Sequence, residues 1–189
     1  MRWEQLFAEL EAAFEAEESA VEQAEAGSRA RAAAGTLRLV DRLRGASGHQ
    51  LVLDCRGAGV VRGRLVDVGV DWVLLTDERG RDLLVALAAV QSVSGLGALT
   101  APPEDDGVVA RAWDLRRAVR GLVRDRAPVQ LLLDGGSALA GTLDRVGADF
   151  VELAEHHLDE PRRRGAVRAV RAVALAAVAV VVSVTPGGA

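Results

Sequence analysis

Apolar and polar residues alternate along two separate stretches of the chain, and each stretch predicts a run of short strands. In residues 49 to 96 the alternation starts at HQLVLDC, and RGAG and ERGRD mark polar turns. Residues 128 to 184 repeat this pattern and end in the apolar run AVALAAVAVVVSV, whose valines suit a buried strand. Five short strands joined by tight turns are typical of a small, strongly bent barrel. We therefore expect two such barrels, which share an edge or pack together because each is small.

The pattern at the N-terminus has the period of a helix instead. Trp3, Phe7, Leu10 and Phe14 recur at steps of four, three and four, which places them on one face of a helix over residues 2 to 24. The first 26 residues hold eight glutamates and one arginine, a net charge of −7. We expect the apolar face to be buried against a barrel or a second chain.

Two further helices are predicted, one before each strand region. The first begins after Ser28, contains Leu37, Val40 and Leu43, and ends near residues 45 to 48. The second, RAWDLRRAVRGLVRDR, has an apolar side of Trp113, Ala118, Leu122 and Val123. The expected organisation is an N-terminal helical arm (1–47), a first small barrel (48–98), a linker (99–110), and a helix followed by a second small barrel (111–185). The fold class is mainly β with helices (α+β).

The two strand regions look like copies of one unit. GRLVDVGVDWVLL (63–75) and GTLDRVGADFVEL (141–153) share seven of 13 positions, and VALAAV recurs at 85–90 and 173–178. The offset grows from 78 to 88, so the second copy has ten extra residues in one loop. Length change confined to one loop is typical of duplicated units.

Each repeated glycine and aspartate predicts a structural role. Gly63 and Gly141 lie within strands, which indicates a sharp bend or a close approach of two backbones. Gly69 and Gly147 are expected to supply a positive φ in a hairpin turn. The aspartates that follow, Asp71 and Asp149, are expected to accept backbone hydrogen bonds in that turn.

The stretch VQLLLDGGSALAGTLDRVGADFVEL (129–153), with its looser counterpart at 51–75, resembles the Sm-like small barrel, an SH3-like fold of bacterial RNA chaperones and eukaryotic Sm proteins. The resemblance implies a tandem protein whose barrels bind nucleic acid, usually RNA. Asp134 and Gly135 match the family's Asp-Gly turn. Sm proteins hold a base with an Asp and a later Asn near strand three, where this chain has GVDW and GADF and no asparagine at all.

Composition argues against several classes of function. The chain has a formal net charge of −4, no phosphate-binding or dinucleotide motif, and no converging catalytic set. We therefore expect a non-enzymatic protein with no catalytic residue, no metal and no cofactor. His156 and His157 are interpreted as residues of a solvated loop. One cysteine, Cys55, and no signal peptide or membrane span favour the cytoplasm.

Arginine clusters supply the candidate binding residues, because arginine contacts phosphate in a bidentate manner. One cluster is the loop with Arg162, Arg163, Arg164 and Arg168, and the other is the helix with Arg116, Arg117, Arg120 and Arg124. Both also suit a merely solvated surface. If the protein binds RNA or DNA, the loop is expected to do most of it through phosphate contacts.

Two functions remain open. One is an RNA-associated regulator of the Sm-like type. The other is a protein-interaction or scaffold module that uses barrel edges and the N-terminal helix, whose Trp3, Phe7, Leu10 and Phe14 would contact a protein partner or a second copy.

Overall fold

The computed structural model describes residues 34–97, 100, 113–158 and 167–183, together with residues 17, 25, 27, 28 and 32. The chain forms two compact units, Met1–Arg38 and Leu39–Ala189. The second unit holds all the strands described below. The Trp3, Phe7, Leu10 and Phe14 face lies outside the described residues, as do Arg162, Arg163 and Arg164.

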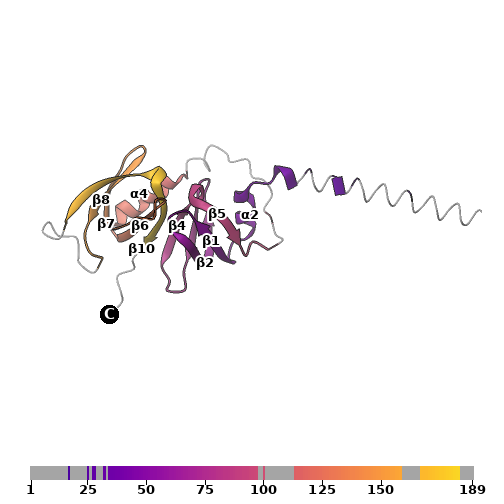
Figure 1. Ribbon diagram of the computed structural model, residues 1–189, viewed down its shortest axis with the longest axis horizontal. Coiled ribbons are helices and arrows are strands. Elements are labelled where there is room, and N and C mark those ends of the chain that lie inside the picture. Colours follow the sequence, from indigo (N-terminus) through magenta and orange to yellow (C-terminus); the bar gives the residue numbers. More distant parts are fainter. Residues whose placement is uncertain are drawn as a thin grey trace, which may run out of the picture. The chain divides into compact units, whose positions relative to one another are not determined.

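The second unit is mainly β with few helices, as the sequence predicts (Figure 1). Its first half consists of α2 (Leu39–Gly45), β1 (Gln50–Cys55), β2 (Gly59–Val68), β3 (Trp72–Thr76), β4 (Asp82–Ala86), the 3-10 turn η1 (Leu87–Ala89) and β5 (Val90–Ser94). Its second half consists of α4 (Leu115–Asp125), β6 (Pro128–Leu133), β7 (Ala138–Val146), β8 (Phe150–Glu155), β9 (Ala169–Ala174), η2 (Leu175–Ala177) and β10 (Val178–Ser183). The predicted second helix is interrupted at Leu37, so that α2 starts two residues later. The expected domain boundaries stay predictions.

In the described residues, the ten strands form one continuous antiparallel sheet in the order β5-β1-β2-β3-β4-β10-β6-β7-β8-β9. The two halves have the same internal order, because β10 takes the place in the second half that β5 takes in the first. They share an edge where β4 pairs with β10, while closure of each half into a barrel stays a prediction. Figure 1 shows the first half in purple to magenta and the second in orange to yellow, with these two strands between them.

The β4–β10 pairing, which we call the seam, interlocks two hydrophobic cores. On β10, Val180 and Val182 pack into the core of the first half, whereas Val181 packs into the core of the second. On β4, Val85 packs into the first core and Leu84 into the second. Because successive side chains of a strand point to opposite faces, each seam strand covers both cores at once. The second half of the valine-rich run, β10, is therefore a buried strand, whereas its first half forms the end of β9 and the turn η2.

Matching main-chain hydrogen bonds recur in both halves and support the duplication. Gly69 N–H donates to Trp72 O at 2.9 Å, and Gly147 N–H donates to Phe150 O at 2.8 Å. Likewise, Leu87 N–H donates to the backbone carbonyl of Asp71, and Leu175 N–H donates to that of Asp149. A bulge also interrupts β2–β3 and β7–β8 at equivalent positions.

The repeated glycines are required by close approaches. A Cβ on Gly63 would lie 2.7 Å from the carbonyl oxygen of Thr76, and one on Gly141 would collide with the carbonyl of Ala154. The expected close backbone approach is therefore confirmed for both glycines.

The positive φ expected for Gly69 and Gly147 is wrong, since neither is among the positive-φ residues of the described chain. At each position an aromatic ring occupies the space that a Cβ would take. The ring belongs to Trp72 at Gly69 and to Phe150 at Gly147. A glycine is needed at each position because the aromatic side chain that begins β3 or β8 packs back against the preceding turn.

We predict that Gly141→Ala destabilises the protein by about 2 kcal/mol or more, because backbone rather than a flexible side chain blocks the added methyl. Gly135→Ala is the matched control, since nothing lies within 4 Å of its Cβ position. It should change stability by less than about 0.5 kcal/mol. Urea denaturation of both variants checks this, and equal midpoints would contradict it.

Candidate functional site

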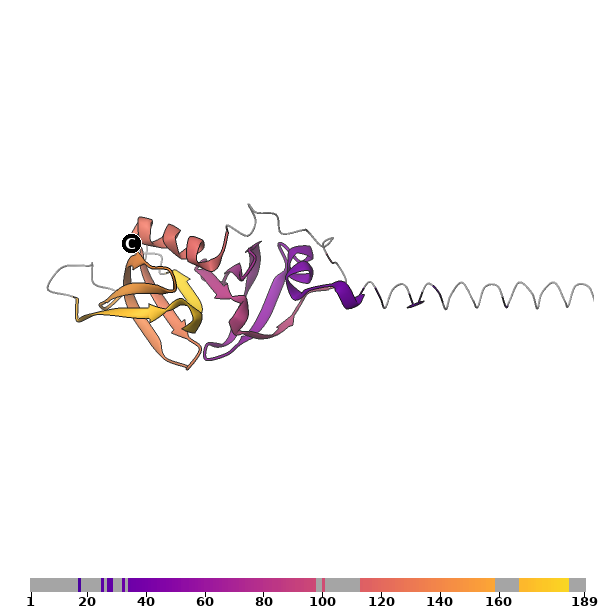
Figure 2. The same cartoon turned by 90° about the horizontal axis from the view of Figure 1, so that it is seen from above.

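The N-terminus of helix α4 is capped by one hydrogen bond of its own and held to the first half by two more. Asp114 caps the helix by accepting from Arg117 N–H at 2.8 Å. The Trp72 indole N–H donates to the carbonyl of Trp113 at 2.9 Å, and the Oδ1 of Asp71 accepts from Leu115 N–H at 2.8 Å. The buried side of the helix, with Leu115 and Val119, completes the second core. Figure 2 shows α4 lying along one side of the second half.

The outer side of α4 carries a row of exposed arginines. Arg117, Arg120 and Arg124 are exposed, and their spacing of three and four residues puts them on one face. Among the described residues, Arg120 and Arg124 have no ion-pair partner. Arg116 is half-buried, with its Nε 3.7 Å from a carboxylate oxygen of Asp114. We call Arg117, Arg120 and Arg124 the arginine face.

An exposed tryptophan adjoins the arginine face. Trp113 was expected on the apolar side of the helix, but it is 52% exposed. The guanidinium of Arg117 lies 4.7 Å from the centre of its ring, a cation–π contact. Trp113 precedes the N-cap and therefore lies outside the helical turn, which is why helix periodicity misplaced it.

The repeated aspartates do different work in the two halves. The side chain of Asp71 accepts from Leu115 N–H at the N-terminus of α4, whereas the side chain of Asp149 makes no such contact within the described residues. Besides a bond to its own backbone in the turn, the Asp71 carboxylate thus has a hydrogen bond to another element. Burial raises the pKa of the Asp71 carboxyl, and the charge of Asp114 adds to this, while the Leu115 hydrogen bond opposes it.

A cavity of about 320 Å³ opens beside this anchor, between equivalent turns of the two halves. Its charged lining residues are Arg56, Asp71, Asp114, Arg116 and Asp134. Three carboxylates against two guanidiniums disfavour a phosphate ligand here. The arginine face, not the cavity, therefore has the electrostatics suited to nucleic acid.

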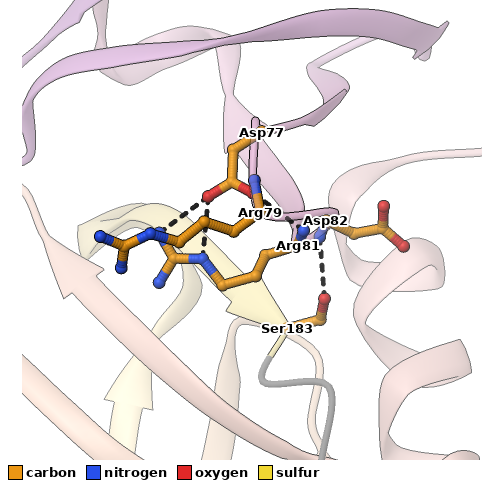
Figure 3. Close-up of polar contacts among 5 residues, drawn as sticks. All are labelled: Asp77, Arg79, Arg81, Asp82 and Ser183. Atoms are coloured by element: carbon orange, nitrogen blue, oxygen red, sulfur yellow. Dashed lines mark hydrogen bonds and ion pairs between the residues drawn. The ribbon is translucent and has the colours of Figure 1, made fainter. Parts of the chain in front are cut away.

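The short turn between β3 and β4 uses its charges internally (Figure 3). Asp77 Oδ1 accepts from the backbone N–H groups of Arg79 and Arg81, each at 2.9 Å, and Oδ2 accepts from Arg81 Nε at 2.8 Å. Beside it, Asp82 N–H donates to the hydroxyl of Ser183 on β10 at 3.0 Å, across the seam. The turn is thus held by Asp77, and the first residue of β4 after it is bonded to β10.

The equivalent loop of the second half is described only at its ends. Arg168 is exposed, its side chain contacts the ring of His157, and its backbone N–H donates to the carbonyl of Glu155. Arg171 Nε donates to a carboxylate oxygen of Glu155 at 2.6 Å. Arg168 at the end of this loop and Arg171 on β9 therefore both have partners.

The interpretation of His156 as a solvated loop residue is wrong. His156 is only 3% exposed, and its Nε2 lies 2.8 Å from the hydroxyl of Thr142. Its Nδ1 lies 2.7 Å from the carbonyl of His157, so Nδ1 carries the proton and, in the neutral ring, Nε2 accepts from Thr142. His156 is a buried structural group, whereas His157 is exposed. Across the described ranges, His, Cys, Asp and Glu side chains nowhere form a group of three that could hold a metal.

Comparison with known proteins identifies no family. No family model matches the chain, and no curated protein or solved structure matches it significantly. None of the helices in the described part has the length and apolar character that a membrane span requires.

The Asp77 turn predicts a specific pH dependence. Partial burial opposes ionisation of Asp77, but the hydrogen bonds from Arg81 and Arg79 outweigh it and hold the pKa of the carboxyl below its usual value. A lowered pKa in the folded state adds stability above the ordinary value of about 4, and this stability is lost as the pH falls through the folded value. Asp77→Asn should therefore unfold at lower urea than the wild type at pH 7, and the gap should close toward pH 3. A gap independent of pH would contradict this assignment.

Proposed function

We propose that the protein is a non-enzymatic nucleic-acid-binding module of the Sm-like type, and that α4 contacts the phosphates of RNA or DNA. The observation that carries the proposal is the arginine face, in which Arg117, Arg120 and Arg124 stand exposed in one row. From the first to the last of these residues the helix rises by about 10 Å. A row of this length can contact successive phosphates along one strand of RNA or DNA.

The side chains of the arginine face suit single-stranded nucleic acid. Guanidinium groups bind phosphate oxygens in a bidentate manner. Trp113, beside the row, is exposed enough to stack on a base. Contacts of this kind read the backbone rather than the base edges, so binding is weak, tolerant of sequence and strongly dependent on salt.

The repeated strand order supports the resemblance to tandem small barrels. In that resemblance the base-holding position falls at Asp71 and Asp149. The first is committed to the N-terminus of α4, so we assign binding to α4 instead. That the protein is non-enzymatic and cytoplasmic stays a prediction, as does any role of Arg162, Arg163 and Arg164, which lie outside the described residues.

A separate observation favours the second candidate, a protein-interaction module. In the described residues, the outer sides of β5 and β9 have no strand partner. Open strand edges are common sites of protein association.

We predict that replacing Arg117, Arg120 and Arg124 by serine weakens binding of labelled single-stranded RNA at least tenfold at low salt. The slope of log affinity against log salt should become shallower by about 2, because about 0.7 counterions are released for each phosphate contact on a single strand. Fluorescence anisotropy at several salt concentrations measures both quantities, and duplex DNA serves as a second probe.

The matched control replaces Arg62, Arg64 and Arg79, three exposed arginines of the first half, by serine. It removes the same charge from a different surface and should bind nearly as well as the wild type. If both triple variants lost the same binding affinity, the effect would come from net charge and not from the arginine face. Absence of binding by the wild type at low salt would exclude the nucleic-acid function and favour the interaction module.

A further inference from the structure

Trp113 is an exposed aromatic residue whose position is fixed by two contacts. Its side chain is 52% exposed, and it belongs to neither hydrophobic core of the described residues. Its carbonyl accepts from the indole N–H of Trp72 at 2.9 Å, which ties its backbone to the start of β3. The guanidinium of Arg117 on α4 lies 4.7 Å from the centre of its ring. The ring is therefore held in place although it lies outside both cores.

An exposed ring that is already held in place is well suited to bind a ligand. A freely rotating side chain loses conformational entropy when it is immobilised against a ligand, and this loss weakens binding. The bond to the Trp113 carbonyl and the cation–π contact remove part of that freedom in the free protein. Preorganisation of this kind raises affinity without adding a contact.

The contact with Arg117 leaves the opposite face of the Trp113 ring for a ligand. A cation–π contact occupies one face of an aromatic ring, and Arg117 is the only cation found over this ring among the described residues. A guanidinium that stacks on a ring keeps its N–H donors in its own plane, where they can still bind phosphate. Arg117 can therefore contact Trp113 and a phosphate at the same time, while a base stacks on the opposite face.

The surroundings of the ring favour a purine base in an unpaired strand. The arginine face beside Trp113 suits phosphate, and a nucleotide carries an anionic phosphate and a flat aromatic base in one ligand. A purine has two fused rings, as the indole has, so it makes more contacts with the indole face than a pyrimidine does. In a duplex both faces of a base are stacked on its neighbours, so only an unpaired base can reach the ring.

We propose that Trp113 is a stacking site for one purine base of a single strand, and that Arg117 positions its ring. The inference rests on the proposed function, because the arginine face supplies the phosphate contacts that bring the strand to the ring. It adds a preference that phosphate contacts do not give. A strand with an unpaired purine binds more tightly than a strand of pyrimidines alone. The preference is modest, because stacking reads the face of the base and not its edges.

The test compares binding of two fluorescein-labelled RNA nonamers to the full-length protein, one of uridines alone and one with a central adenosine. In fluorescence anisotropy at low salt, the wild type should bind the adenosine strand about threefold more tightly. Trp113→Ala should weaken binding of that strand by about fivefold or more and abolish the preference. It should leave the slope of log affinity against log salt unchanged, because stacking releases no counterions from phosphate.

Further variants separate stacking from a structural effect of the ring. Trp113→Phe keeps a ring that can stack, so it should retain most of the affinity. The quenching of tryptophan fluorescence that an unlabelled strand causes in the wild type should largely disappear in this variant. Arg117→Ser and its matched control Arg124→Ser each remove one phosphate contact, so both should make the salt slope shallower by about 0.7. Only Arg117→Ser should also reduce the purine preference, because Arg117 contacts the ring.

The outcomes distinguish this inference from the proposed function. If the wild type binds neither strand at low salt, the nucleic-acid function itself is excluded. If the wild type binds both strands equally, or if Trp113→Ala binds like the wild type, the stacking site is overturned while the arginine face stands. Equal weakening in Trp113→Phe and Trp113→Ala would also overturn it, because the indole would then act through the structure and not by stacking.

Discussion

The pairing of β4 with β10 is the interaction on which the rest of the structure depends. Each seam strand sends alternate side chains into different cores, so neither half can close its core without a strand from the other. Val180 and Val181 are each 1% exposed although they point to opposite faces, and full burial of such a side chain contributes about 1.5 kcal/mol or more. The seam therefore makes one cooperative unit from two halves that are each too small to bury much surface alone.

The two halves share backbone features but differ in many of their side chains. The glycine-aromatic contacts, the turn hydrogen bonds and the bulges recur in both halves. Their loops and ends diverged. Asp71 holds the N-terminus of α4, while its counterpart Asp149 makes no such contact within the described residues. This anchor holds the helix that carries the arginine face, so the two repeated aspartates differ in role between the halves.

Strand positions were predictable from the sequence because alternation, turn residues and an internal repeat agreed with one another. The seam partner was not predictable, since the apolar run of β10 indicates a buried strand without saying which strands flank it. The repeated phrase correctly indicated that a glycine is required at position 69, but not why. The reason is the ring of Trp72, whose position depends on the fold and not on the turn alone. The burial of His156 was missed for the same cause. Its partner Thr142 lies on another strand, where only the register brings the two together.

For the candidate site, the sequence identified the helix and its arginines, but it could not separate the exposed Arg120 from the half-buried Arg116. The face became visible only when the packing of Val119 on the second core fixed the orientation of α4.

Native-state hydrogen exchange tests the role of the seam most directly. If both cores are completed across β4 and β10, the most protected amides of β2 in the first half and of β7 in the second should exchange through the same global opening. They should then have equal free energies of opening and an equal dependence on denaturant. If the amides of one half exchange through a much smaller opening while the other half stays protected, the halves are independent and the account is contradicted.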